Sequence, residues 1–282
     1  MIKQTLCFCA TLFVALATTI SKAETANRSP FSVCYVPPGD YNVSAIYLQN
    51  VNSLLLALRP NASLTGFAAG VAGQPPNRVY GTALCFGDAS SVDCRGCIDK
   101  ATEGTSSLCG SRQMWYDHCV VRYSPSNFLG VADAELIAGI YNTNNPAALD
   151  RAVFNQQLVR LLSNLTAIAT GSRSRLMFAA GDTYLTAGQT IHSSVQCSRD
   201  ISLVDCGTCL ANLTSRIQKD SIDVTDVMVY SRTCIIGYQL LQPSSSIAPR
   251  VGLQWFGSSN ILVAIIISTF STALWQHALF HL

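Results

Sequence analysis

The pattern of apolar residues predicts amphipathic helices in two separate parts of the chain. Leucine and other apolar residues recur at the spacing of one helix face in segments 47–58 and 154–165. Proline has no amide hydrogen with which to continue a helix, so we expect Pro60 to end the first of these helices. Further helices are expected after Ser90 and Ser202, where Ser-x-x-Asp has the form of a capping box. One face of the last helix would be lined by Cys206, Cys209, Leu213 and Ile217.

Alternating apolar and polar residues predict strands between and after these helices. Segments 78–85 (RVYGTALC) and 190–197 (TIHSSVQC) each end in a cysteine, and segment 234–238 repeats the alternation. The stretch from Trp115 to Tyr123 alternates throughout, so we expect it to form one strand. These elements predict an α+β fold with helices packed on an antiparallel sheet.

The same elements occur twice in the same order. The spacing Cys-x8-Cys-x2-Cys begins at Cys85 and recurs 112 residues later, and Phe-Ala-Ala-Gly begins at Phe67 and recurs 111 residues later. The segment CVVRY (119–123) is likewise matched by CIIGY (234–238). A nearly constant offset over several features indicates two tandem disulfide-rich modules of about a hundred residues each.

We place the first module at 31–128 and the second at 147–242. Between them, turn-forming residues accumulate from Tyr141 to Pro146, and this composition favours a linker.

The two ends of the chain have the character of targeting signals. Residues 1–23 hold a lysine (Lys3), an apolar run and small residues at the cleavage point, which is typical of a secretory signal peptide. Residues 243–260 form a spacer before the uncharged apolar tail at 261–282, which is long enough to span a bilayer. Because no Lys or Arg follows the tail, we favour a glycolipid-anchor signal cleaved near Ser244 over a retained single-pass helix.

Cysteines and sequons point to the secretory pathway. Outside the predicted signal peptide ten cysteines remain, and an even number in an exported chain predicts disulfides. They are Cys34, Cys85, Cys94, Cys97, Cys109, Cys119, Cys197, Cys206, Cys209 and Cys234. The candidate N-glycosylation sites are Asn27, Asn42, Asn61, Asn164 and Asn212. We expect an extracellular chain at the outer face of the plasma membrane, with plasmodesmata as a candidate location.

The charge of the chain argues against nucleic acid as a partner. The formal net charge is +2, but three basic residues lie in the two end segments. Residues 24–244 hold fifteen basic and sixteen acidic side chains, and these form no basic cluster.

No catalytic constellation is evident. His118 and His192 lie in predicted strands without a nucleophile in a recognised context. Asp88, Asp93 and Asp99 could pair as in a glycosidase, but helix capping and solvent exposure account for them equally well. We therefore expect neither enzymatic activity nor a cofactor.

Two Cys-x-x-Cys pairs begin at Cys94 and Cys206. Redox chemistry and zinc binding are the alternatives to structural disulfides. Each pair has further cysteines at matching spacing within its own repeat, so structural disulfides are favoured and no metal site is expected.

The segments GTALCFGDASSVDCRGC (81–97) and CVVRYS (119–124) resemble the plant ginkbilobin-homologous, or stress-antifungal, domain. The resemblance covers nearly all of residues 31 to 240. Two such domains between a signal peptide and an apolar tail are similar to cysteine-rich repeat secretory and plasmodesmata-located proteins.

The resemblance implies a disulfide pairing. In the first module the pairs would be Cys34–Cys109, Cys85–Cys94 and Cys97–Cys119. In the second they would be Cys197–Cys206 and Cys209–Cys234, because both counterparts of the Cys34–Cys109 pair are missing. We expect the second module to be the less stable one, and to pack on the first through an apolar contact.

The resemblance also implies a function. We expect a non-enzymatic cell-surface protein acting in cell-to-cell communication or defence signalling, with receptor-like kinases or other ectodomains of the family as partners. The alternatives are a lectin-like binder of cell-wall polysaccharide and a secreted antifungal protein.

Single-domain antifungal members of the family bind mannose through an Asn, an Arg and an acidic residue. Here Tyr35 and Ser124 replace the Asn and the acid, and Arg112 lies about one position out of register. We therefore do not expect mannose binding, and we interpret Arg112 as a solvated residue at a strand edge.

Overall fold

The structure is a computed structural model that describes residues 30–35, 43–104, 109–142, 149–185, 188–220 and 224–242. The predicted signal peptide, the apolar tail, Asn27, Asn42 and Ser244 lie outside these ranges. Among the described helices, none combines the length and apolar character needed to cross a membrane.

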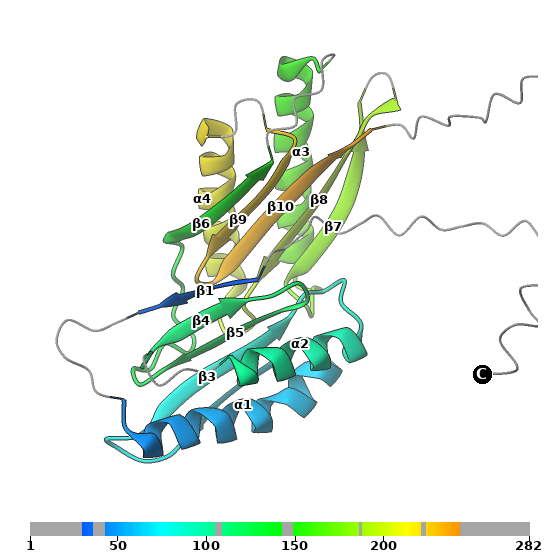
Figure 1. Ribbon diagram of the computed structural model, residues 1–282. Coiled ribbons are helices and arrows are strands. Elements are labelled where there is room, and N and C mark those ends of the chain that lie inside the picture. Colours follow the sequence, from blue (N-terminus) through cyan, green and yellow to red (C-terminus); the bar gives the residue numbers. More distant parts are fainter. Residues whose placement is uncertain are drawn as a thin grey trace, which may run out of the picture. The chain divides into compact units, whose positions relative to one another are not determined.

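The chain forms the same seven elements twice (Figure 1). The first module contains β1 (Phe31–Cys34), α1 (Ala45–Thr65), β2 (Phe67–Ala72), β3 (Val79–Cys85), α2 (Ser91–Glu103), β4 (Arg112–Trp115) and β5 (Cys119–Ser124). The second contains β6 (Leu136–Asn142), α3 (Arg151–Ala169), β7 (Phe178–Tyr184), β8 (Thr190–Cys197), α4 (Leu203–Asp220), β9 (Asp226–Ser231) and β10 (Cys234–Leu241). Both modules belong to one compact unit.

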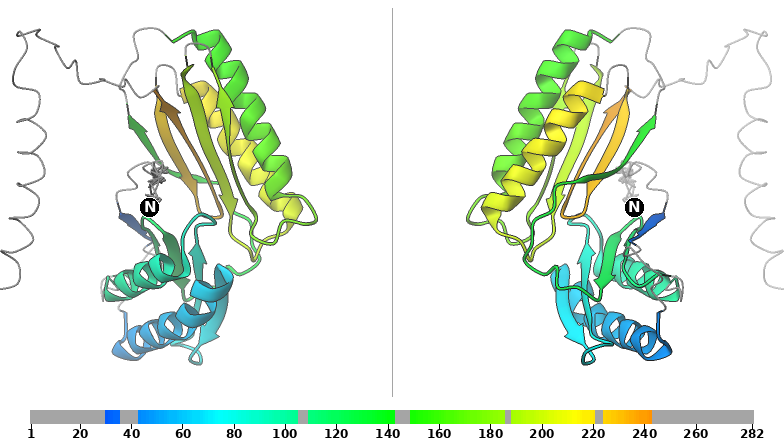
Figure 2. Two further views of the ribbon diagram at one scale, coloured as in Figure 1. Left: turned by 90° about the vertical axis from the view of Figure 1, so that its right-hand side faces the viewer. Right: turned by 90° about the vertical axis from the view of Figure 1, so that its left-hand side faces the viewer.

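Each module has a five-stranded antiparallel sheet with the same strand order. The orders are β1-β4-β5-β3-β2 and β6-β9-β10-β8-β7. Helices α1 and α2 pack on one face of the first sheet, and α3 and α4 pack on one face of the second (Figure 2). The predicted α+β class and the tandem repeat are confirmed.

Each module has its own hydrophobic core between its helices and its sheet. Leu55, Ile98 and Val121 are fully buried in the first core. The predicted face of α4 is confirmed, because Cys206, Cys209, Leu213 and Ile217 are at most 2% exposed. Burial of this apolar area is the main force that holds helices and sheet together.

The predicted helix starts are also confirmed. The Asp93 amide donates to Ser90 Oγ (3.1 Å), and the Ser90 hydroxyl donates to an Asp93 carboxylate oxygen (2.6 Å). Ser202 and Asp205 repeat this arrangement at the start of α4. Such reciprocal bonds satisfy amide groups that have no partner in the first turn of a helix.

The prediction that Pro60 ends the first helix is wrong. Helix α1 continues through Pro60 to Thr65 and ends at Gly66, whose φ of 87° lies in the left-handed region. Pro60 is exposed, so the carbonyl group that loses its amide partner can bond to water instead. Beyond the proline, Ala62 is completely buried, and this packing favours one more turn of helix.

The prediction of one strand from Trp115 to Tyr123 is also wrong. Strand β4 ends at Trp115 and β5 begins at Cys119, with a tight turn between them that the Tyr116 amide closes by donating to the Cys119 carbonyl (2.9 Å). Alternation continues across this short turn, so a period of two could not reveal it.

The predicted linker overlaps a strand. Tyr141 and Asn142 belong to β6, which pairs with β9 at the edge of the second sheet. The second sheet therefore begins before residue 147, and residues 125–135 connect the two sheets. The polar composition at the end of β6 concealed its strand character.

Candidate functional site

Within the part of the chain that the structure describes, five disulfides tie the helices and sheets together. They join Cys34–Cys109, Cys85–Cys94, Cys97–Cys119, Cys197–Cys206 and Cys209–Cys234. These are the same pairs that the family resemblance implies. The two cysteines of each Cys-x-x-Cys pair thus belong to different bridges, which leaves no dithiol for redox chemistry. Within the described residues, no cluster of His, Cys, Asp and Glu could hold a metal ion.

The candidate catalytic residues lie apart in separate local interactions. His118 lies in the β4–β5 turn, whereas His192 Nδ1 lies 2.6 Å from an Asp182 carboxylate oxygen on the neighbouring strand. Asp93 belongs to a helix cap, and Asp99 pairs with Arg59 (2.5 Å).

The three positions that correspond to the mannose-binding residues of the family have structural partners. Arg112 is not at a sheet edge, because β4 lies between β1 and β5, and the interpretation as an edge residue is wrong. Its guanidinium group donates to the Gly104 carbonyl and to Ser32 Oγ (2.7 Å). Ser124 is buried and accepts a bond from a backbone amide, and Tyr35 lies beneath the guanidinium of Arg232. Pairing between β1 and β4 is a long-range contact that local sequence could not predict.

The two modules contact each other through the sheet faces that carry no helix. The contact cluster contains Leu84, Phe86, Trp115 and Val120 of the first module and Met228, Tyr230 and Ile235 of the second. Phe31 stacks on Trp115 with ring centroids 4.7 Å apart, and it meets Tyr230 edge to face at 5.0 Å. The predicted apolar contact between the modules is therefore confirmed.

Two buried glutamines cross this contact in opposite directions. Gln196 of β8 donates to the Cys85 carbonyl and accepts from the Gly87 amide, both at 3.0 Å. Gln113 of β4 donates to the Arg232 carbonyl, also at 3.0 Å. The two side chains are at most 4% exposed, so separating the modules would require rehydrating their amides and their backbone partners.

A glycine allows the two modules to approach closely. A Cβ atom at Gly87 would lie 2.2 Å from Cγ of Phe178, which is far below van der Waals contact. Any larger residue at this position would therefore push the modules apart.

The connecting segment (residues 125–135) is held in place by polar contacts. Arg232 in the β9–β10 turn forms ion pairs with Asp133 (2.6 Å) and Glu135 (2.8 Å). Partial burial raises the pKa of Asp133, but the hydrogen bond and charge of Arg232 outweigh burial and hold it below its usual range.

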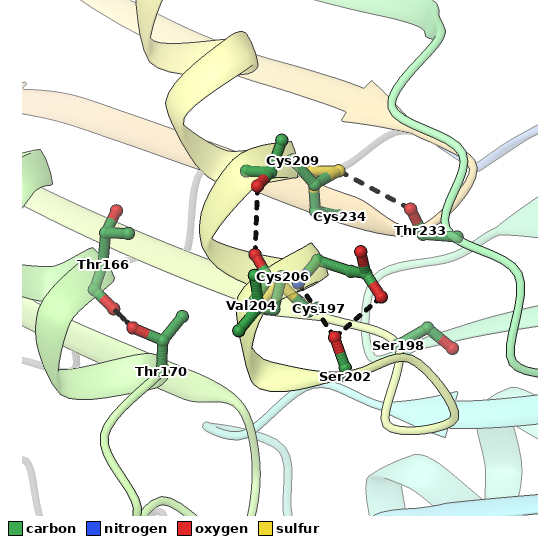
Figure 3. The surroundings of a disulfide bond; sticks show 12 residues. Thr166, Thr170, Cys197, Ser198, Ser202, Val204, Cys206, Cys209, Thr233 and Cys234 are labelled. Carbon is green, nitrogen blue, oxygen red and sulfur yellow. Dashed lines mark hydrogen bonds between the residues drawn. A yellow bond between two sulfur atoms is a disulfide. The ribbon is translucent and has the colours of Figure 1, made fainter.

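The connecting segment also contacts Thr233 of the β9–β10 turn, which lies beside one of the second module's disulfides (Figure 3). Cys209 Sγ lies 3.5 Å from Oγ1 of Thr233, and Figure 3 shows this contact beside the Cys209–Cys234 bridge. The Thr233 hydroxyl in turn donates to the Asp133 carbonyl (2.8 Å) and accepts from the Asp133 amide (3.1 Å).

A cleft of about 190 Å³ lies beside the module contact. Ser63, Leu64, Thr65 and Ser90 line it from the first module, and Leu176 and Arg199 line it from the second. Arg199 crosses the cleft and donates to the Thr65 carbonyl (2.5 Å).

Comparison with known proteins identifies the family. Residues 33–126 and 141–240 match the family model described as salt stress response/antifungal. The chain belongs to this family.

Members of the salt stress response/antifungal family with similar sequences include secretory and antimicrobial proteins. The chain is 34% identical to cysteine-rich repeat secretory protein 38 of Arabidopsis thaliana over 207 residues, which cover 72% of this chain and 81% of that protein. It is 29% identical over 206 residues to an antimicrobial ginkbilobin-2-like protein of Castanea crenata, covering 71% and 83% of the two chains.

A solved structure has the same fold. The tandem DUF26 ectodomain of the Arabidopsis thaliana cysteine-rich receptor-like protein PDLP8 superposes with a TM-score of 0.63 and 21% identity. The match covers 74% of this chain and 96% of the ectodomain. At this identity the likeness concerns the fold alone.

The polar part of the contact between the modules was not predicted from the sequence. One signal was present in the repeat: Gln196 precedes Cys197 where Leu84 precedes Cys85. An amide at a position that is apolar in the other module, on a strand of the sheet, indicates a specific buried partner. No local signal marked Gly87 or Arg199, because their partners lie in the other module.

Proposed function

We propose that the chain is a non-enzymatic interaction protein of the plant cell surface, similar in role to plasmodesmata-located proteins. It would act in cell-to-cell communication or defence signalling by binding ectodomains of other membrane proteins. The family membership and the ectodomain-like tandem fold support this proposal.

One observation carries the proposal. The modules are joined by an apolar cluster and by two buried glutamines that cross it. Such a contact sets the relative orientation of the modules, so residues from both can form one recognition surface. A preorganised surface loses less conformational entropy on binding than two freely moving domains.

Capture of binding partners tests this proposal. The full chain in plant membranes would be crosslinked at the cell surface, with Gly87→Leu as the variant that separates the modules. We expect the unmodified chain to capture ectodomains of receptor-like kinases or related family members, and the variant to capture at least tenfold less. Equal capture by both chains, or capture of no membrane protein, would contradict the proposal.

A specific observation favours lectin-like binding as a second candidate. On the helix-free face of the second sheet, Asp182 and His192 form a pair and remain about half exposed. Tyr184, on the same strand face, is 80% exposed. Carboxylate, imidazole and phenol groups beside one another can bind sugar hydroxyls, while the ring packs against a sugar face.

A glycan array separates the two candidates. The lectin-like function predicts a signal with cell-wall oligosaccharides that Tyr184→Ala and His192→Ala abolish, while Tyr141→Ala on the opposite edge of the sheet retains it. The absence of any glycan signal, together with capture of ectodomains, would leave the interaction function as the supported one.

We place the protein at the outer face of the plasma membrane, held by a glycolipid near Ser244. A phosphatidylinositol-specific phospholipase should then release it from plant membranes. Retention in the membrane pellet, while a known lipid-anchored protein is released, would favour a single-pass helix instead.

A further inference from the structure

The cleft between the modules has an exposed apolar rim. Leu64 is 83% exposed, more than any other large apolar side chain in the described residues, and Leu176 across the cleft is 38% exposed. Single exposed leucines are ordinary on protein surfaces. Here, however, one leucine from each module lines the same cleft, next to the Arg199 guanidinium that already spans it.

A glycosylation sequon lies directly beside this rim. Asn61 is exposed on α1, and the Ser63 of its Asn-Ala-Ser sequon itself lines the cleft. Leu64 and Thr65 follow Asn61 by three and four residues, so all three share one face of the helix. One helical turn rises by about 5.4 Å, so a sugar attached to Asn61 starts within about one turn of the cleft.

We propose that Asn61 carries an N-linked glycan whose first N-acetylglucosamine lies in this cleft and connects the two modules. The apolar C–H face of the sugar ring packs on Leu64 and Leu176. Its acetamido and hydroxyl oxygens accept bonds from Arg199, whose guanidinium carries five N–H donors. The sugar therefore covers an apolar rim and extends an existing contact between the modules.

The modification itself requires only the export that the disulfides and relatives support. The secretory pathway's transferase supplies an oligosaccharide linked through C1 to a polyprenyl diphosphate. The C1–O bond of this donor breaks, a C1–N bond forms to Asn61 Nδ2, and polyprenyl diphosphate leaves together with one amide proton. This chain provides only the acceptor side chain.

Asn164 supplies a matched control. It is an exposed sequon on α3, the second module's counterpart of α1, but neither it nor its sequon threonine lines the cleft between the modules. A glycan at Asn164 is therefore not expected to affect the contact between the modules.

The test uses the full chain produced in plant cells. Peptide mass spectrometry should find Asn61 occupied. Asn61→Gln should increase hydrogen exchange severalfold in segments 174–178 and 198–201 of the second module and lower the melting temperature by roughly 2–4 °C. Asn164→Gln should change neither quantity. An unoccupied Asn61, or equal exchange in both variants, would overturn the proposal.

Enzymatic trimming of the folded protein avoids any effect of substitution on folding. On chains made with oligomannose glycans, an endoglycosidase that leaves one N-acetylglucosamine should preserve the slow exchange of both segments. Complete removal of the glycan should abolish it. Loss of protection already at the first trimming step would overturn the assignment of the first sugar to the cleft.

Discussion

The two modules share one strand order, yet they hold their outer strand by different means. In the first module, Cys34 of β1 is bridged to Cys109, 75 residues away. Strand pairing places Cys34 opposite Arg112, and the equivalent pair in the second module is Tyr141 and Val227. Tyr141 thus occupies the position of Cys34, and β6 carries no bridge.

Longer strand pairing and a tyrosine hydrogen bond present in both modules accompany the missing bridge. Strand β6 has seven residues, whereas β1 has four. The Tyr238 hydroxyl donates to the Val224 carbonyl (3.1 Å), as the Tyr123 hydroxyl donates to the Cys109 carbonyl (3.3 Å). The comparison teaches that backbone pairing can hold an outer strand in place without a covalent bond, although such pairing does not restrict the unfolded chain.

The largest effect is expected from removing the first module's long-range bridge. Replacing Cys34 and Cys109 together by serine should lower the free energy of unfolding by about 4 kcal/mol, because the unfolded chain regains the entropy of an open loop. Denaturant unfolding of the full chain measures this. A loss below about 1 kcal/mol would mean that strand pairing alone holds β1, as it holds β6.

Separating the modules should have the next largest effect. Gly87→Leu introduces atoms where Phe178 packs, and we expect a loss of about 2–3 kcal/mol. Hydrogen exchange should rise mainly in the second module, which has no long-range bridge. Gly96→Leu is the matched control, because a Cβ atom at Gly96 meets nothing within 4 Å. An equal rise in both modules would contradict the expected asymmetry.

A disulfide introduced in the second module, at the positions equivalent to Cys34 and Cys109, should stabilise that module. Tyr141→Cys combined with Val224→Cys should form a sixth disulfide and add about 1–3 kcal/mol, less than the loop model gives because engineered bridges distort native geometry. Non-reducing peptide mapping detects the bond. Two free thiols at these positions would show that the strand positions are not equivalent.

Acid should weaken the contact between the connecting segment and the second module. The pKa of Asp133 lies below its ordinary value of 3.8 in the folded chain, so its pairing with Arg232 stabilises the fold above that pH. This stability is lost as the pH falls through the lower, folded-state pKa.

Asp133→Asn should therefore flatten the dependence of melting temperature on pH below about pH 4. Glu135→Gln serves as the control, since that carboxylate contacts the same arginine but is 64% exposed. If the control flattens the profile as much as Asp133→Asn does, the assignment to Asp133 is wrong.

The smallest effect is expected at the indole of Trp115. Its Nε1 atom is buried and has no hydrogen-bond partner among the described residues. Trp115→Phe should therefore change the free energy of unfolding by less than about 1 kcal/mol. Trp115→Ala is the comparison variant, because it removes the whole ring from the module contact and should cost clearly more than Trp115→Phe. Similar losses for both variants would reveal a role for the N–H group.

Repetition and periodicity in the sequence determined the architecture of each module. The spacing of leucines places α1 and α3 on their sheets, and Ser90 and Ser202 start the next helices through contacts within four residues. These features are local, so the sequence alone carries the information. The cysteine spacing and its family resemblance similarly implied the five bridges that the structure contains.

Tertiary structure decided the features that depend on distant partners. Helix α1 passes Pro60 because Ala62 packs in the core. Strand β4, which carries Arg112, is an inner strand of its sheet because β1 pairs with its outer side. Gln196 and Gly87 acquire their roles only where the second module meets the first. Local propensities amount to fractions of a kcal/mol per residue, so burial and long-range pairing override them at these positions.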